Sequence, residues 1–291
     1  MGFAHALRAS PASATHARFA RIDALALTAL AQELACPLKP GLVSPQDRGA
    51  HPDMDAATFV RSIAALRGCF AELAEAGADG ACFAELATIG RAAEVRMLRA
   101  TDERNTHRGA IFSLGLLAAA AGRLHAVRPS APLLCKTVGR EWGVEIMHAV
   151  PVGPARTPGD FVRCRYRAPG AREQAAAGFP VVLEHGLPAL RAARPAGLKR
   201  ASLQALYAIV LVLDDNNLLY RGGEAGLAFA RAEARRFMEA GGMLQPQAWA
   251  RAAQVYAGQP DFAVAFLIDG RAPRAGARSS LTAQGVTLHA L

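Results

Sequence analysis

The sequence has few aromatic residues and very little lysine. Phe, Trp and Tyr make up 6% of its 291 residues, and lysine occurs only at Lys39, Lys136 and Lys199. Arginine therefore supplies almost all of the positive charge behind the net charge of +9. No basic block is interleaved with the aromatics on which single-strand binders stack bases. This pattern argues against nucleic acid as a partner, and a small anionic substrate explains the arginines equally well.

Paired cysteines and long apolar runs are also missing. The five cysteines are odd in number and include no CxxC pair, which is typical of a reducing compartment and argues against a structural zinc site. The longest apolar stretch runs from Ala110 to Ala121 and is shorter than the roughly 20 residues that span a bilayer. We therefore expect a cytoplasmic protein with no membrane segment.

The common catalytic and phosphate-binding motifs do not occur either. The chain has no GxxxxGK[ST] loop, no GxGxxG after a strand, no GxSxG and no HExxH. Any chemistry must therefore come from carboxylates, histidine and arginine.

Hydrophobic periodicity predicts helices along most of the chain. Apolar residues recur at spacings of three and four, while the alternation that marks strands is nearly absent. We expect an all-α fold, with a single compact multi-helix domain whose active-site loops lie at helix junctions. The predicted limits are a flexible N-terminal extension over residues 1–22, a helical catalytic domain over 23–258 and a divergent, mobile tail over 259–291.

The predicted helices begin at capping residues and end at glycine or proline. Asp23 is expected to cap a helix that ends at Cys36, and Asp55 is expected to cap a long helix that runs to about Gly77. Residues 150–170 are rich in proline and glycine and are expected to form a loop. The other predicted helices cover residues 81–100, 107–121, 133–149, 173–177, 180–193, 198–213, 224–240 and 245–257.

Three polar clusters lie at predicted helix junctions, where loops on a rigid scaffold commonly hold binding residues. The first cluster runs from Lys39 to Asp55 and includes Gly41, His51 and Asp53. Its carboxylates suit Mg²⁺, which usually takes one or two of them and completes its shell with water and substrate phosphates. The alternative for Asp55 is that it only caps the next helix.

The second cluster, residues 105–109, opens the most apolar helix. The free N–H groups of a helix N-terminus, together with His107 and Arg108, would form an anion site. Simple capping by Asn105 or Thr106 is the alternative.

The third cluster consists of residues 214–217 and 221–224. Two adjacent acids, Asp214 and Asp215, follow an apolar helix directly, and an arginine or a metal is their natural partner there. The alternative is a plain solvated turn.

Taken together, these segments resemble the triphosphoribosyl-dephospho-CoA synthase family that serves citrate lyase and malonate decarboxylase. The similar motifs occur in the family's order and spacing from about Ala31 to Gly242. Arg108 stands where many members have lysine, and Asn216 where many have threonine. Residues 257–262 lack the Ser-Pro-Gly-Gly stretch that members carry near the C-terminus. The motifs are KPGLV (39–43), GAHPDMD (49–55), NTHRGAIFSLGLL (105–117), GFP (178–180), LPAL (187–190) and DDNNLLYRGG (214–223).

The resemblance implies a helical enzyme that uses ATP as a triphosphoribosyl donor. In that reaction the 2′-hydroxyl of 3′-dephospho-CoA attacks the ribose anomeric carbon and adenine leaves. The product, 2′-(5″-triphosphoribosyl)-3′-dephospho-CoA, passes to an acyl-carrier-protein holo-synthase. Mg²⁺ is expected with the triphosphate. The pattern does not decide the oligomeric state.

This chemistry needs one group that deprotonates the nucleophile and one that protonates the leaving group. Asp53 or Asp215 is the expected base, and His51 or His107 is expected to assist the departing adenine. Asp53 and Asp214 are the candidates for Mg²⁺. The candidate substrate-binding residues are Lys39, Gly41, Asn105, Arg108, Asn217, Arg221, Gly222 and Gly223.

Within this set, Lys39, Arg108 and Arg221 are expected to hold phosphates, while Gly222 and Gly223 let the backbone approach the substrate closely. Two other functions stay open at this point. One is a Mg²⁺-dependent ribosyl hydrolase on a helical scaffold, in which water replaces the 2′-hydroxyl. The other is a nucleotide-binding or nucleic-acid-binding protein without turnover.

Overall fold

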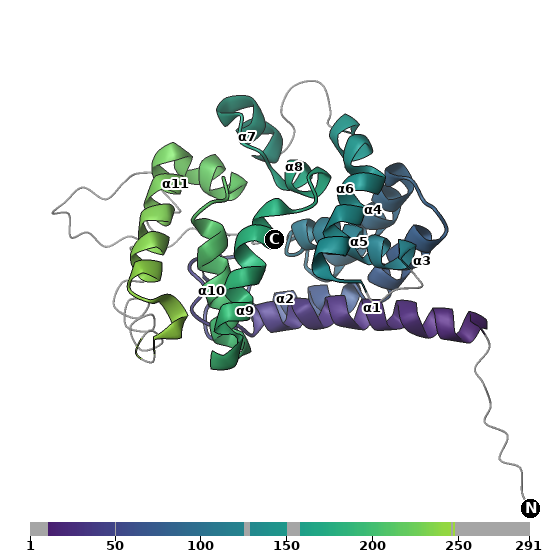
Figure 1. Cartoon of the computed structure of the whole chain (residues 1–291), viewed down its shortest axis with the longest axis horizontal. Helices are drawn as coiled ribbons and strands as arrows, with labels where there is room; N and C mark the ends of the chain where they lie inside the picture. Colours follow the sequence, from purple (N-terminus) through teal and green to yellow (C-terminus); the bar gives the residue numbers. More distant parts are fainter. Residues whose placement is uncertain (1–10, 50, 125–128, 150–157, 246, 248–291) are drawn as a thin grey trace, which may run out of the picture.

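The computed structural model of the chain describes residues 11–49, 51–124, 129–149, 158–245 and 247, which form a helical fold (Figure 1). Within these ranges there is no β-strand, and strand-like pairing is limited to an isolated bridge between Ser44 and Asp47. The all-α prediction is therefore confirmed. None of the described helices combines the length and the apolar character that crossing a bilayer requires.

The elements follow one another along the chain with short connections. They are α1 (Pro11–Leu34), α2 (Ala56–Ala65), α3 (Cys69–Ala78), α4 (Phe83–Ala100), α5 (Arg108–Arg123), α6 (Ala131–His148), α7 (Pro158–Tyr166), α8 (Ala171–Ala176), the π-helix η1 (Val182–Gly186), α9 (Leu187–Ala193), the 3₁₀ turn η2 (Arg194–Ala196), α10 (Leu198–Val210), α11 (Asn216–Glu239) and the 3₁₀ turn η3 (Gly242–Leu244).

The larger hydrophobic core joins α3, α4, α5 and α6 with α1 and α8 (Figure 1). Its closest helix pair is α3 and α5, which cross at small residues. A Cβ atom added at Gly77 would overlap the backbone of Ala119, and one at Gly122 would overlap the backbone of Ala74. Only glycine allows two helix backbones to approach this closely. The crossing therefore fixes the second half of α5 closely against α3.

A second core joins α7, α10 and α11, with Leu203 and Leu218 among its buried side chains. It connects to the end of α1, because the thiol of Cys36 donates to the carbonyl oxygen of Lys199 at the start of α10 (3.5 Å). The cavity described below receives side chains from both cores.

Helix α1 begins at Pro11, so residues 11–22, which were expected to form a flexible extension, are helical. Asp23 lies inside this helix and does not cap it. Its carboxylate instead accepts hydrogen bonds from the backbone N–H groups of Gly68 and Phe70, both at 3.0 Å, where α3 begins. Asp23 thus caps a helix distant in sequence, a role that a local pattern cannot reveal.

Two further predictions need correction. The long helix expected from Asp55 to Gly77 is divided into α2 and α3, because Gly68 adopts a left-handed conformation with φ of 85°. Helix α7 forms inside the stretch expected to be a loop, where Val162 is fully buried in the second core. The tail expected over residues 259–291, and nearly all of the helix expected over 245–257, lie outside the described residues.

Candidate active site

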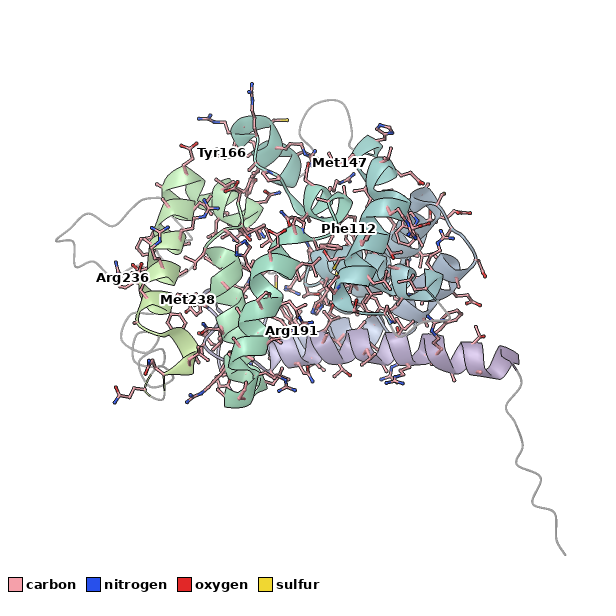
Figure 2. All side chains as sticks on the ribbon, in the orientation of Figure 1. Phe112, Met147, Tyr166, Arg191, Arg236 and Met238 are labelled. Carbon is pink, nitrogen blue, oxygen red and sulfur yellow. The ribbon has the colours of Figure 1, made fainter. Side chains whose placement is uncertain are left out.

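A cavity of about 1060 Å³ lies where α4, α5, α7 and α8 meet the turn that precedes α11. Phe112 of α5, labelled in Figure 2, is part of its apolar lining. Typical ligand pockets have volumes of about 300–1,000 Å³, so this cavity has room for a large ligand or for two smaller ones. The second polar cluster and the turn of the third cluster both line it.

His107 of the second cluster lies at the start of α5 and is buried, with 4% of its surface exposed. Its Nδ1 is 2.6 Å from the hydroxyl oxygen of Ser62, and the Thr106 hydroxyl donates to the same Ser62 oxygen at 2.6 Å. Phe59 packs its ring edge-on against the imidazole, with centroids 5.1 Å apart. These contacts hold the imidazole in one orientation at the cavity lining.

Arg108 and Asn105 also line the cavity, but Arg108 is not a free cation. Its guanidinium forms an ion pair with Glu94 of α4, another lining residue. The side chain of Asn105 accepts a hydrogen bond from the backbone N–H of Arg108 (3.1 Å), the first residue of α5, although the N-cap residue of this helix is His107.

Asp215 is the N-cap of α11 and lies on the cavity while only 7% exposed. Its Oδ1 accepts hydrogen bonds from the backbone N–H groups of Asn217 (2.8 Å) and Leu218 (2.9 Å). Burial raises the pKa of Asp215 to about 6, against the lowering effect of these two bonds. A carboxyl group that titrates close to neutral pH in a cavity is suited to general base catalysis.

Asp214 also lines the cavity, and its partner is an arginine of α11. The Arg231 guanidinium donates to its carboxylate at 2.8 Å and to the carbonyl oxygen of Val212 at 3.0 Å. We expected an arginine or a metal to neutralise this acidic turn. For Asp214, the neutralising partner is Arg231. Asn216, two residues after Asp214, also lines the cavity, and its buried Oδ1 accepts no hydrogen bond within the described part of the chain.

The polar side chains of the first cluster are not part of the described cavity lining, which takes only Leu42 and Val43 from this segment. Lys39 is buried, and its ammonium group is bound to the carboxylate of Glu33. Gly41 lies close to Gly49, where an added Cβ would stand 2.5 Å from the Gly41 carbonyl oxygen.

His51 is buried, and its Nδ1 is 3.9 Å from the exposed carboxylate of Asp53. Burial lowers the pKa of Arg221, while Tyr220 and Asp53 act to raise it. The first and third clusters are therefore within electrostatic reach of each other, although His51, Asp53 and Arg221 do not line the cavity.

Gly222 and Gly223 are also outside the lining. Gly222 is buried within α11, and Gly223 has φ of 60°, which produces a kink inside this helix. Helix α11 begins at Asn216 and not near Glu224 as predicted.

Comparison with known proteins gives the family. The family model described as ATP:dephospho-CoA triphosphoribosyl transferase matches residues 19–257. A protein of Acinetobacter calcoaceticus named "Probable 2-(5''-triphosphoribosyl)-3'-dephosphocoenzyme-A synthase" is 38% identical over 229 residues, which cover 77% of this chain and 78% of that protein. Proteins of Pseudomonas putida and Albidiferax ferrireducens with the same name are 40% and 37% identical over 230 and 250 residues, covering 76% and 82% of this chain and 80% and 83% of theirs.

The chain belongs to this family. It is therefore a transferase, and the resemblance seen in the sequence motifs is confirmed. No solved structure matches the chain.

In this transferase, the sequence motifs missed several charged residues of the cavity. Arg91 and Glu94 come from α4, Asp160 and Arg163 from α7, and Arg172 from α8. Arg163 binds Glu173 (2.9 Å) and Asp160 (3.4 Å), so it connects α7 to α8. A single arginine on an amphipathic helix carries no local signal that separates it from a solvated one. The expected loop over residues 150–170 further concealed the helix that presents Asp160 and Arg163.

The donor set of the cavity is compatible with Mg²⁺ that arrives with a nucleotide. Among the described residues, no group of three or more His, Cys, Asp or Glu side chains could enclose a metal ion by itself. Mg²⁺ in nucleotide sites usually takes one or two carboxylates and completes its shell with phosphates and water. Asp214, which is partly exposed on the cavity, fits that role, whereas Asp53 lies outside the lining.

Proposed function

We propose that this transferase moves the triphosphoribosyl group of ATP to the 2′-hydroxyl of 3′-dephospho-CoA and releases adenine. The main observation in support is that Asp215, with its raised pKa, and the oriented imidazole of His107 line the same cavity. One group can accept a proton near neutral pH and the other can supply one, which are the two roles that displacement at an anomeric carbon requires.

In the proposed step, the Asp215 carboxylate takes the proton of the acceptor 2′-hydroxyl. The hydroxyl oxygen forms a bond to the anomeric carbon of ATP as the bond from that carbon to the adenine nitrogen breaks. His107 then gives a proton to the leaving adenine. The contacts of Thr106 and Ser62 suit this role in the protonated imidazole, because the Ser62 oxygen can accept from Nδ1–H as well as from Thr106, which leaves the proton on Nε2 for the adenine.

Substrate phosphates would lie against the positive residues of the cavity. Bound Mg²⁺ would neutralise part of the triphosphate charge, with Asp214 as the protein carboxylate that holds it. Asn216, with its unused buried oxygen, is placed to accept a hydrogen bond from a ribose hydroxyl or an adenine amino group.

The product would pass to an acyl-carrier-protein holo-synthase, and we place both reactions in the cytoplasm. The cysteines of the described residues support a reducing compartment, because Cys36, Cys69, Cys82, Cys135 and Cys164 are all free thiols.

The decisive experiment is incubation of the purified protein with ATP, Mg²⁺ and 3′-dephospho-CoA, followed by mass analysis. Free adenine and the enlarged CoA derivative should form in equal amounts. Asp215→Asn and His107→Gln should each reduce both products. The rival ribosyl hydrolase would release adenine from ATP when dephospho-CoA is omitted, and that result would refute the proposed transfer.

A further inference from the structure

Four arginines line the cavity, and two of them are already neutralised. Arg108 forms an ion pair with Glu94, and Arg163 forms ion pairs with Glu173 and Asp160. Their positive charge is therefore largely committed to the protein itself.

The other two arginines, Arg91 and Arg172, have neutral partners only. Arg91 donates to the hydroxyl of Thr88 at 2.9 Å, and Arg172 donates to the carbonyl oxygen of Ala149 at 2.9 Å. Neither forms an ion pair within the described ranges. Both nevertheless line the same cavity.

Each of these two arginines is close in sequence to a residue that contacts one half of the candidate reaction centre. Arg91 is one helical turn before Glu94, whose ion pair with Arg108 joins α4 to the start of α5 next to His107. Arg172 is two residues after Gly170, which closely approaches the side chain of Asn216 next to Asp215. The uncompensated positive charge thus lines the same cavity as His107 and Asp215.

We propose that Arg91 and Arg172 are the phosphate-binding residues of this cavity. A guanidinium without a carboxylate partner gains most from a phosphate, because its planar fork matches two phosphate oxygens. Lys39, by contrast, is bound to Glu33 and is not part of the lining. The identity of the nucleotide rests on the proposed function, but the phosphate site itself does not.

The first test measures binding of inorganic tripolyphosphate by calorimetry at fixed ionic strength, without turnover. Arg91→Ala and Arg172→Ala should each weaken binding by about 10- to 150-fold, the range expected for one charge-assisted hydrogen bond. Arg172→Lys should recover part of the affinity. The matched control is Arg99→Ala, an exposed arginine on α4 outside the lining, which changes the net charge equally. Melting temperatures of the ligand-free variants check folding.

The second test separates the two sources of phosphate. A rise in KM for ATP assigns an arginine to the triphosphate, and a rise in KM for dephospho-CoA assigns it to the acceptor pyrophosphate. If the wild-type protein binds tripolyphosphate through these two arginines but shows no transferase activity, the proposed function is refuted and the phosphate site stands. Equal weakening by Arg99→Ala, or unchanged KM values for both substrates in active variants, would overturn the proposal.

Discussion

The Nδ1 atom of His107 lies 2.6 Å from the Ser62 hydroxyl, in a contact that joins α5 to the interior of α2. Ser62 is fully buried and Thr106 is 1% exposed, so water cannot replace either hydroxyl without rearrangement. The tautomer and the orientation of the imidazole therefore depend on a residue that does not line the cavity.

Ser62→Ala should lower kcat more than it raises KM, because it removes the group that orients His107 while the cavity lining stays the same. The lost buried hydrogen bond should also reduce the free energy of unfolding by about 1–3 kcal/mol. Steady-state kinetics and denaturant unfolding on one preparation measure both effects. A loss of stability with unchanged kcat would show that Ser62 only supports the fold.

Asp215→Asn should abolish most activity, since an amide cannot take the proton of the 2′-hydroxyl. General base catalysis typically contributes about 10²–10⁴-fold, and the loss should fall in that range. In the wild-type protein, kcat/KM should fall as the pH drops through about 6, the pKa of Asp215. The residual kcat/KM of Asp215→Asn should not show this acidic limb, which is the fall in kcat/KM as the pH drops through about 6. If the limb persists in Asp215→Asn, another group is the base.

The same substitution should make the folded protein more stable at neutral pH. The folded pKa of Asp215 is about 6, above the ordinary 3.8, so the folded state holds the proton more tightly and stability falls as the pH rises between these values. Removing the buried charge should restore up to about 3 kcal/mol at pH 7, and asparagine is an equally good N-cap.

The matched control is Asp55→Asn, the same change at the N-cap of α2. Hydrogen bonds from the backbone and hydroxyl of Thr58 lower the pKa of Asp55, so its contribution is present at neutral pH and is lost as the pH falls. This variant should therefore melt at a lower temperature than wild type at pH 7, opposite to Asp215→Asn. Melting curves at pH 4 and pH 7 on both variants test the signs.

Gly122→Ala should destabilise the protein strongly, because the new Cβ would overlap the backbone of Ala74 and force α3 and α5 apart. Overpacking of this kind costs about 1–3 kcal/mol or more. Gly109→Ala is the control in the first turn of the same helix, where an added Cβ meets nothing within 4 Å. It should be neutral or stabilise by up to about 1 kcal/mol. Equal melting temperatures for the two variants would contradict the close crossing.

Local sequence patterns predicted a helix start correctly where the capping residue is adjacent to the helix that it caps. Asp55 caps the helix that follows it, as predicted, whereas the cap that Asp215 provides for α11 was not predicted. The pattern failed where a partner lies far along the chain. Asp23 caps α3 from within α1, and α7 is stabilised by burying Val162 in a core assembled from distant helices.

The same distinction applies to the residues of the candidate site. The second cluster and residues 214–217 meet at one cavity. In the first cluster, the cavity takes the apolar Leu42 and Val43, while Lys39 is bound to Glu33. Which side of an irregular segment faces a cavity depends on packing, and residue type does not report it. For the same reason Arg91 and Arg172 could not be selected from the other arginines.

The ion pair between Asp214 and Arg231 provides a test of the proposed Mg²⁺ role. If Asp214 holds the ion, Asp214→Asn should raise the Mg²⁺ concentration needed for half-maximal activity. Arg231→Gln should lower this Mg²⁺ concentration, because the carboxylate loses its competing cation.

The side chains of Asp214 and Arg231 are partly exposed, at 39% and 28%, so breaking the pair should cost no more than about 1 kcal/mol of stability. The control is Arg236→Gln on the same helix, which removes an exposed ion pair with Glu233. Arg236 is labelled in Figure 2. Titration of activity against Mg²⁺ at saturating ATP separates the possibilities. If Asp214→Asn and Arg231→Gln shift the midpoint in the same direction, or leave it unchanged while lowering the melting temperature, the pair is structural and the ion is held elsewhere.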